Sequence, residues 1–135
     1  MIDTQQITVS SNTLMSNTNT NANIFENDKN EIRFFLGQES ICADCDNVVS
    51  TQNCTVLGNA NIKVALIEHF MATLALLNIK GVDVCLDNFE MPILDGSSKV
   101  WVEKLEPLKK ELSDKFYTKG ILVNKNMRRI YCIIK

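Results

Sequence analysis

The stretch between residues 62 and 78 constrains the fold most strongly, because its apolar residues recur with the spacing of one broad helix face. They are Val64, Ile67, Phe70, Met71, Leu74 and Leu77. Gly81 follows, and apolar side chains at Val82, Val84 and Leu86 then alternate with other residues, as in a strand that buries one face. A core helix, a turn and a half-buried strand in succession predict helices packed on a sheet.

Shorter strand signals precede this unit. Residues 31–36, ended by Gly37, and residues 54–57, ended by Gly58, are β-prone and are expected to share one sheet. Residues 10–30 are rich in Ser, Thr and Asn, a composition that favours loop or weak strand, and we interpret them as a long surface connection.

Helix and turn signals follow the half-buried strand at residues 82–86. Residues 91–98 contain Pro and Gly and are expected to be irregular, with Ser97 or Ser98 capping a helix that begins near Lys99 and ends or bends at Pro107. Within that segment, Asp95, Gly96 and Ser97 predict a structural turn. Glycine allows a sharp bend, and the polar side chains accept hydrogen bonds from the unpaired backbone N–H groups at the start of the next helix. Residues 120–123 and 130–134 predict a C-terminal hairpin.

The composition fits one globular domain over residues 1–135 and excludes several classes of protein. A formal net charge of −2 argues against a nucleic-acid partner, which would require clustered Lys and Arg. No apolar run is long enough to predict a membrane span, and the polar N-terminus does not resemble a signal peptide, so a cytoplasmic location is expected. The five cysteines are therefore expected to be reduced thiols.

Two stretches resemble one enzyme family. Residues 67–74, Ile-Glu-His-Phe-Met-Ala-Thr-Leu, are similar to the Val-Glu-His-Leu-Met-Ala-Ala-Leu helix of the zinc-dependent UDP-3-O-acyl-N-acetylglucosamine deacetylases of lipid A biosynthesis. Residues 90–98, Glu-Met-Pro-Ile-Leu-Asp-Gly-Ser-Ser, are similar to that family's Glu-Ile-Pro-Ile-Met-Asp-Gly-Ser-Ala. The similarity spans roughly residues 31–106 and matches residues 1–30 poorly. It implies the family's N-terminal domain, an α+β two-layer sandwich in which one mostly antiparallel sheet is covered by two helices.

The resemblance also implies roles for two residues. Glu68 matches the family's general base, and His69 matches one ligand of its zinc ion. The other two ligands come from a His-x-x-x-Asp helix in the family's second domain, which no residue here matches. The family's Leu-His-Thr-Gly turn would fall near residues 15–18, where this chain has neither His nor Gly.

Two functions of different class follow. The first is a deacetylase-like domain that is non-catalytic alone and acts as an interaction or regulatory module, either as a homo-oligomer or with a chain resembling the second deacetylase domain. The alternative is one half of a split deacetylase that uses Glu68 and His69, with zinc bound only when another chain supplies ligands. Cys42 and Cys45 form a lone Cys-x-x-Cys, which could be a redox or zinc half-site but is more simply a pair of incidental thiols.

Overall fold

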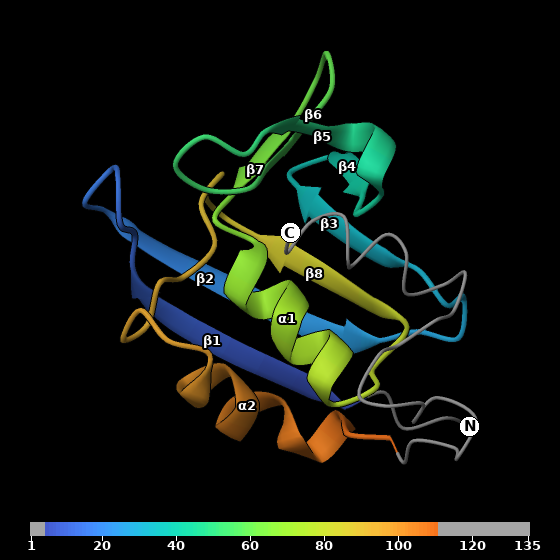
Figure 1. Ribbon diagram of the computed structural model, residues 1–135. Helices are drawn as coiled ribbons and strands as arrows, with labels where there is room; N and C mark the ends of the chain where they lie inside the picture. The colour runs from blue at the N-terminus through green and yellow to red at the C-terminus, as the bar shows by residue number, and fades with distance from the viewer. Residues whose placement is uncertain (1–4, 111–135) are drawn as a thin grey trace.

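The computed structural model describes residues 5–110 of the 135-residue chain as helices packed on a mixed sheet, with a second, smaller sheet beside them (Figure 1). This is an α+β fold, as the sequence predicts. The elements in chain order are β1 (Gln6–Asn12), β2 (Asn19–Glu26), β3 (Ile32–Leu36), β4 (Glu39–Cys42), the 3-10 helix η1 (Cys45–Asn47), β5 (Val48–Ser50), β6 (Val56–Gly58), β7 (Lys63–Ala65), α1 (Glu68–Leu76), β8 (Val82–Leu86), α2 (Lys99–Leu105) and the 3-10 helix η2 (Glu106–Leu108).

The larger sheet has the strand order β1-β2-β8-β3-β4. All of its neighbouring pairs are antiparallel except β3 and β8, which run parallel with Phe34 opposite Val84. The predicted strands at residues 31–36 and 82–86 are therefore confirmed, and Gly37 ends the first of them with a positive φ of 64°.

The surface connection predicted for residues 10–30 is wrong, because most of this segment forms β1 and β2. The two strands pair in register from Gln6 opposite Phe25 to Asn12 opposite Asn19. Their inward positions, Val9, Thr20, Ala22 and Ile24, are buried. Most of the outward positions are polar, among them Ser10, Asn21 and Asn23. The many polar residues obscure this alternation in the sequence, and the strands are stable only because they pair in a sheet.

One face of the larger sheet carries α1 and α2 (Figure 1). Phe70 on α1 is fully buried and makes edge-to-face contacts with Phe34 of β3 and Trp101 of α2, at ring-centroid distances of 5.9 and 5.1 Å. Trp101 and Leu105 form the buried side of α2, with Val102 partly buried. The core lies between these helices and the sheet.

The smaller sheet corrects two further predictions. Its order is β5-β6-β7, so the strand predicted near residues 54–57 belongs to it and does not share the sheet that contains β3. The helix predicted from residue 62 begins only at Glu68, because Lys63–Ala65 is strand β7. Val64 and Ile67 are buried in both arrangements, which is why periodicity alone extended the helix too far.

The second helix begins at Lys99 as the sequence predicts, and it ends at Leu105, where η2 (Glu106–Leu108), which contains Pro107, follows. The N-cap residue Ser98 makes no side-chain capping hydrogen bond, and Ser97 Oγ accepts from the Lys99 backbone N–H at 3.2 Å. Residues 91–98 contain no helix and no strand beyond a single bridge at Glu90 before them. The predicted hairpin at residues 120–134 lies outside the described residues.

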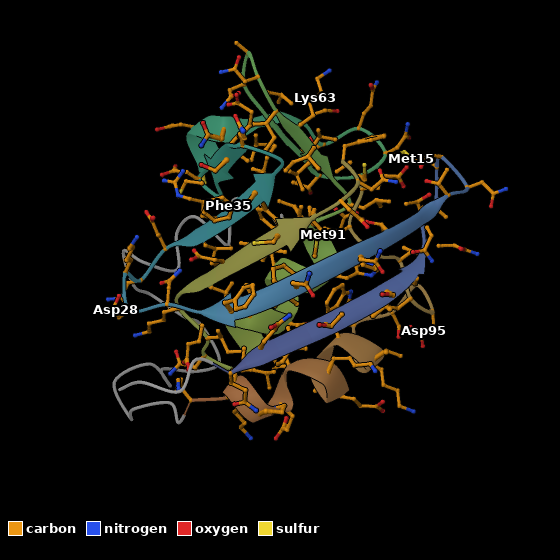
Figure 2. The ribbon with its side chains drawn as sticks, turned by 180° about the vertical axis from the view of Figure 1, so that it is seen from behind. Met15, Asp28, Phe35, Lys63, Met91 and Asp95 are labelled. Carbon is orange, nitrogen blue, oxygen red and sulfur yellow. The ribbon has the colours of Figure 1, made fainter. Side chains whose placement is uncertain are left out.

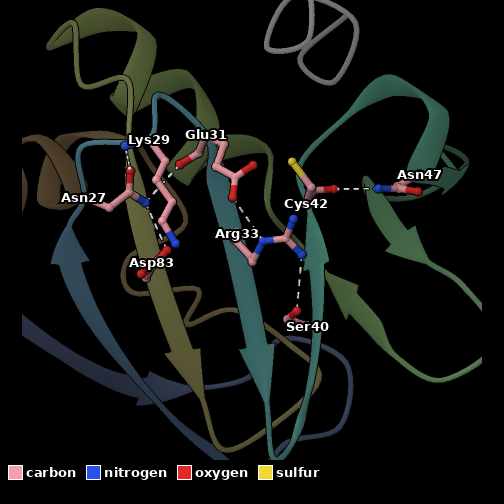
Figure 3. Close-up of polar contacts among 8 residues, drawn as sticks. All are labelled: Asn27, Lys29, Glu31, Arg33, Ser40, Cys42, Asn47 and Asp83. Carbon is pink, nitrogen blue, oxygen red and sulfur yellow. Dashed lines mark hydrogen bonds and ion pairs between the residues drawn. The ribbon is translucent and has the colours of Figure 1, made fainter.

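The other face of the larger sheet carries a layer of polar side chains (Figure 2). Thr8 Oγ1 donates to Asn23 Oδ1 at 2.8 Å, and Ser10 bonds to Asn21. Nearer to β4, Arg33 donates to Ser40 Oγ at 3.2 Å, among the contacts drawn in Figure 3. The sheet therefore has one apolar face, which the helices cover, and one face that carries many polar side chains.

Phe70→Ala is predicted to lower the free energy of unfolding by about 3–5 kcal/mol, because it removes the ring that joins the sheet to both helices. Urea unfolding followed by circular dichroism measures this loss. Leu76→Ala on the same helix is the control, since Leu76 is 64% exposed and should change stability by no more than about 0.5 kcal/mol. Equal losses in the two variants would contradict this account of the core.

Candidate functional site

The two predicted site residues lie at the first turn of α1. Glu68 is the first residue of the helix, and its Oε2 accepts a hydrogen bond from the Thr55 backbone N–H at 2.9 Å. The residue before it, Ile67, provides no side-chain cap, and Glu68 places a negative charge in the first turn, where the helix dipole favours one. One oxygen of Glu68 is thus held by the segment before β6.

A short irregular segment between β7 and α1 sets the direction in which Glu68 leaves the sheet. Leu66 has a φ of 63°, in the left-handed region that non-glycine residues seldom adopt. Its N–H donates to the Thr55 carbonyl at 3.1 Å, while Thr55 N–H donates to Glu68. Thr55 therefore ties down both the turn and the carboxylate, and this is how the structure maintains the strained residue.

His69 lies next to Glu68 and is half-buried. Its backbone carbonyl accepts a hydrogen bond from Thr73 Oγ1 at 2.8 Å, one turn further along the helix. Within residues 5–110, no hydrogen bond or ion pair involves the imidazole ring. The ring nitrogens of the only histidine in the chain are therefore available to a group outside the described residues.

A third titratable group, Cys54, lies near this helix start. Burial is the main cause that raises the pKa of its thiol, and the charges of Glu68 and Glu90 raise the pKa further. A thiol with a raised pKa stays protonated at neutral pH and is a poor nucleophile.

The residues described do not compose a metal site by themselves. No group of three or more His, Cys, Asp or Glu side chains among them is arranged to hold a metal ion. Cys42 ends β4 and Cys45 begins η1, and both are half-buried thiols that take part in no disulfide within the described part of the chain. A hydrolytic zinc ion typically takes three protein ligands, so these side chains fit at most part of such a site.

Glu90 is the feature that sequence reasoning missed. Its side chain is fully buried, and its carboxylate accepts hydrogen bonds from the backbone amides of Met15 and Ser16 at 3.0 and 2.9 Å. A single backbone bridge joins Glu90 to Ala65, close before Glu68. The sequence signal was present: a lone glutamate within an apolar stretch, which must find partners if it is buried.

The segment after Glu90 holds the residues predicted to form a turn. Asp95 Oδ1 accepts from the Ser97 backbone N–H at 3.0 Å and from its hydroxyl at 2.7 Å, and Gly96 has a φ of 84°. The hydrogen bonds that Ser97 donates are the main reason that the pKa of Asp95 is lowered. The hydrogen bonds of these side chains are to each other and to Lys99 at the start of α2.

Among the helices that the structure describes, none has the length and apolar character needed to cross a membrane.

Comparison with known proteins gives one family. The family profile described as "LpxC: UDP-3-O-acyl N-acetylglycosamine deacetylase" matches residues 4–129, well beyond the range marked by the two motifs and including most of the N-terminal segment.

Individual relatives carry that description or name the same family as one part of a bifunctional enzyme. The UDP-3-O-acyl-N-acetylglucosamine deacetylase of Lawsonia intracellularis is 36% identical over 58 residues, covering 43% of this chain and 19% of that protein. The bifunctional enzyme LpxC/FabZ of Porphyromonas gingivalis is 47% identical over 73 residues, covering 52% and 15%. The deacetylase of Brucella ovis is 28% identical over 95 residues, covering 70% and 29%. The chain spans less than a third of the length of each of these three relatives.

Glu68→Ala is predicted to lower the free energy of unfolding by about 1–3 kcal/mol, because the Thr55 N–H loses its carboxylate acceptor and the helix loses a negative charge at its start. Glu68→Gln keeps an acceptor oxygen and should cost only about 0.5 kcal/mol. Urea unfolding of both variants provides the comparison. If Gln and Ala destabilise the chain equally, the Thr55 contact is not what holds this side chain.

Proposed function

Because this chain belongs to the UDP-3-O-acyl N-acetylglycosamine deacetylase family, we propose that it provides Glu68 and His69 to a deacetylase site that residues outside the described part complete. Alone, the described part is non-catalytic under this proposal. The observation that carries the proposal is the combination of an anchored carboxylate with a neighbouring imidazole that has no partner within residues 5–110.

Glu68 suits the role of a proton acceptor. Thr55 holds Oε2, which leaves Oε1 able to accept a proton from a water molecule that attacks an amide carbonyl. When the water oxygen bonds to the carbonyl carbon, the proton moves to Glu68, and it can return to the nitrogen as the carbon–nitrogen bond breaks. This would release acetate and a free amine from an N-acetylated sugar, the substrate class that the names of the relatives describe.

His69 suits the role of one ligand in a shared metal site. In the family, zinc would polarise the carbonyl and the attacking water. The described side chains fit only part of such a site, so zinc would require ligands from another segment or another chain. The family's second domain, with its His-x-x-x-Asp helix, is the partner chemistry that the proposal specifies.

A second candidate function is an interaction or regulatory module without catalysis. The exposed apolar side chains at the end of the β1–β2 hairpin and beside Glu90 favour it: Leu14 is 60% exposed, Met15 52% and Phe89 43%. Exposed apolar side chains such as these can mark a contact surface. A homo-oligomer and a complex with a second-domain-like chain both fit this alternative.

The proposal predicts that the chain alone hydrolyses no UDP-linked N-acetylated sugar, and that adding a polypeptide with the His-x-x-x-Asp helix produces both zinc retention and deacetylation. Glu68→Gln in that complex should lower kcat by about 10²–10⁴-fold, because the proton acceptor is lost while the fold is kept. Metal analysis and an amine-release assay measure the two effects.

The control is His69→Gln, which should lose zinc as well as activity, whereas Glu68→Gln should lose activity alone. Activity that survives Glu68→Gln would rule out the base. A complex that forms without zinc and without turnover would favour the interaction module.

A further inference from the structure

Glu90 lies where three segments of the chain meet, and the proposed catalytic pair does not account for it. The segments are the loop between β1 and β2 (residues 13–18), the end of β7 and the stretch that follows β8. Met15 and Met91, which flank this point in the fold, are labelled in Figure 2. A fully buried carboxylate is rare unless its oxygens are paired, so its partners indicate what it does.

The partners of the carboxylate are backbone amides of the loop. Oε2 accepts from Met15 N–H at 3.0 Å and Oε1 from Ser16 N–H at 2.9 Å, so each oxygen holds one residue of the loop. The Glu90 carbonyl accepts from Thr20 Oγ1 at 2.9 Å at the start of β2. These contacts join residues at least 70 positions apart in the sequence.

The backbone of the same segment is joined to β7. Ala65 N–H donates to the Phe89 carbonyl at 2.8 Å, and Met91 N–H donates to the Ala65 carbonyl at 3.0 Å. Glu68 begins α1 three positions after Ala65. Glu90 is therefore fixed through its main chain to the segment that leads into α1, and through its side chain to the 13–18 loop.

The charge of Glu90 matches this arrangement. Burial raises the pKa of the carboxyl, but the hydrogen bonds from Met15 and Ser16 outweigh it, and the pKa lies below the ordinary value for glutamate. Among the described residues, titratable groups near it include Cys54, whose thiol lies in the field of Glu90, and Asp87, which follows β8 and binds Asn21. The 13–18 loop contains no titratable side chain. An ionised Glu90 thus accepts two charge-assisted hydrogen bonds at neutral pH.

We propose that Glu90 is a positioning residue that holds the 13–18 loop in place relative to the start of α1. Through it, the exposed Leu14 and Met15 side chains keep a constant place relative to Glu68 and His69, so that they can contact the apolar part of an acylated substrate. The contact with the 13–18 loop follows from the structure alone, and the link to substrate rests on the proposed function.

Glutamate is required for this role because two N–H donors converge on one side chain. In Glu90→Gln, the amide oxygen can accept from one of the two, but the side-chain NH₂ faces the other donor with a donor of its own. The variant has nearly the same shape as the native side chain, so it removes the second contact with little change in packing.

Amide NMR on the full 135-residue chain tests the contact directly. In the native protein, the Met15 and Ser16 amide shifts should follow one titration curve with an apparent pKa below about 4.3, the usual value for glutamate. Below that pKa the carboxyl is protonated, and the protection of the loop amides against exchange, relative to the intrinsic rate at each pH, should fall because the stabilisation from a lowered pKa is lost as pH falls through it. Glu90→Gln should abolish this titration and raise hydrogen exchange at both amides by about tenfold or more at neutral pH.

Asp87→Asn is the matched control. It makes the same change of charge three positions away, but Asp87 bonds to Asn21 in the body of β2, at 2.8 Å to N and 2.6 Å to Nδ2. The Met15 and Ser16 amides should behave in this variant as in the native chain. Amides that do not titrate with Glu90 in the native chain would overturn the proposal, even if Glu90→Gln failed to fold.

The link to substrate is tested in the two-part enzyme. Glu90→Gln should raise KM for an acylated substrate by about tenfold with kcat within about twofold, and Asp87→Asn should change neither. If Glu90→Gln changes the exchange and titration of the Met15 and Ser16 amides but leaves KM unchanged, Glu90 holds the loop and the link between the loop and the substrate is wrong. If even the native complex is inactive, the proposed function fails, and the NMR result still decides whether Glu90 holds the loop.

Discussion

The packing of α1 on the five-stranded sheet is the interaction on which the rest of the structure depends. Phe70, Met71 and Leu74 are fully buried from one side of this helix, and Phe34 and Val84 are fully buried from adjacent parallel strands below it. Removing this much apolar surface from water is the largest favourable term available to a domain of this size. It orders the sheet and places α2, because Trp101 packs on Phe70.

A consequence of that packing is the place of the candidate site at the beginning of α1. The apolar face must lie on the sheet, so the first turn projects where β7 ends. The polar groups there are held by backbone contacts from elsewhere in the fold: Thr55 binds Glu68, and Glu90 binds the 13–18 loop. A site held by such contacts is positioned by the scaffold more than by its own loops.

Sequence reasoning succeeded where the signal is local. The alternation at residues 82–86 predicts β8 with its bounds, and the residues that punctuate the chain, Gly37 and Pro107, end the elements they were expected to end. It was wrong where partners decide the conformation. Residues 19–26 are polar and Asn-rich, yet they form a strand because they pair with β1 and β8. Residues 63–65 pair with β6 as a strand, although their helical periodicity predicted that they belong to the helix.

The sequence alone determined the fold class, the core helix and its following strand, and the adjacency of Glu68 and His69, because each depends on neighbours along the chain or on burial with a fixed period. Only the tertiary structure decided that a second sheet exists, that Thr55 holds Glu68, and that Glu90 reaches the 13–18 loop. These contacts join residues 13 to 75 positions apart in the sequence. The polar groups lose their water only when the core forms, and from then on they need each other as hydrogen-bond partners.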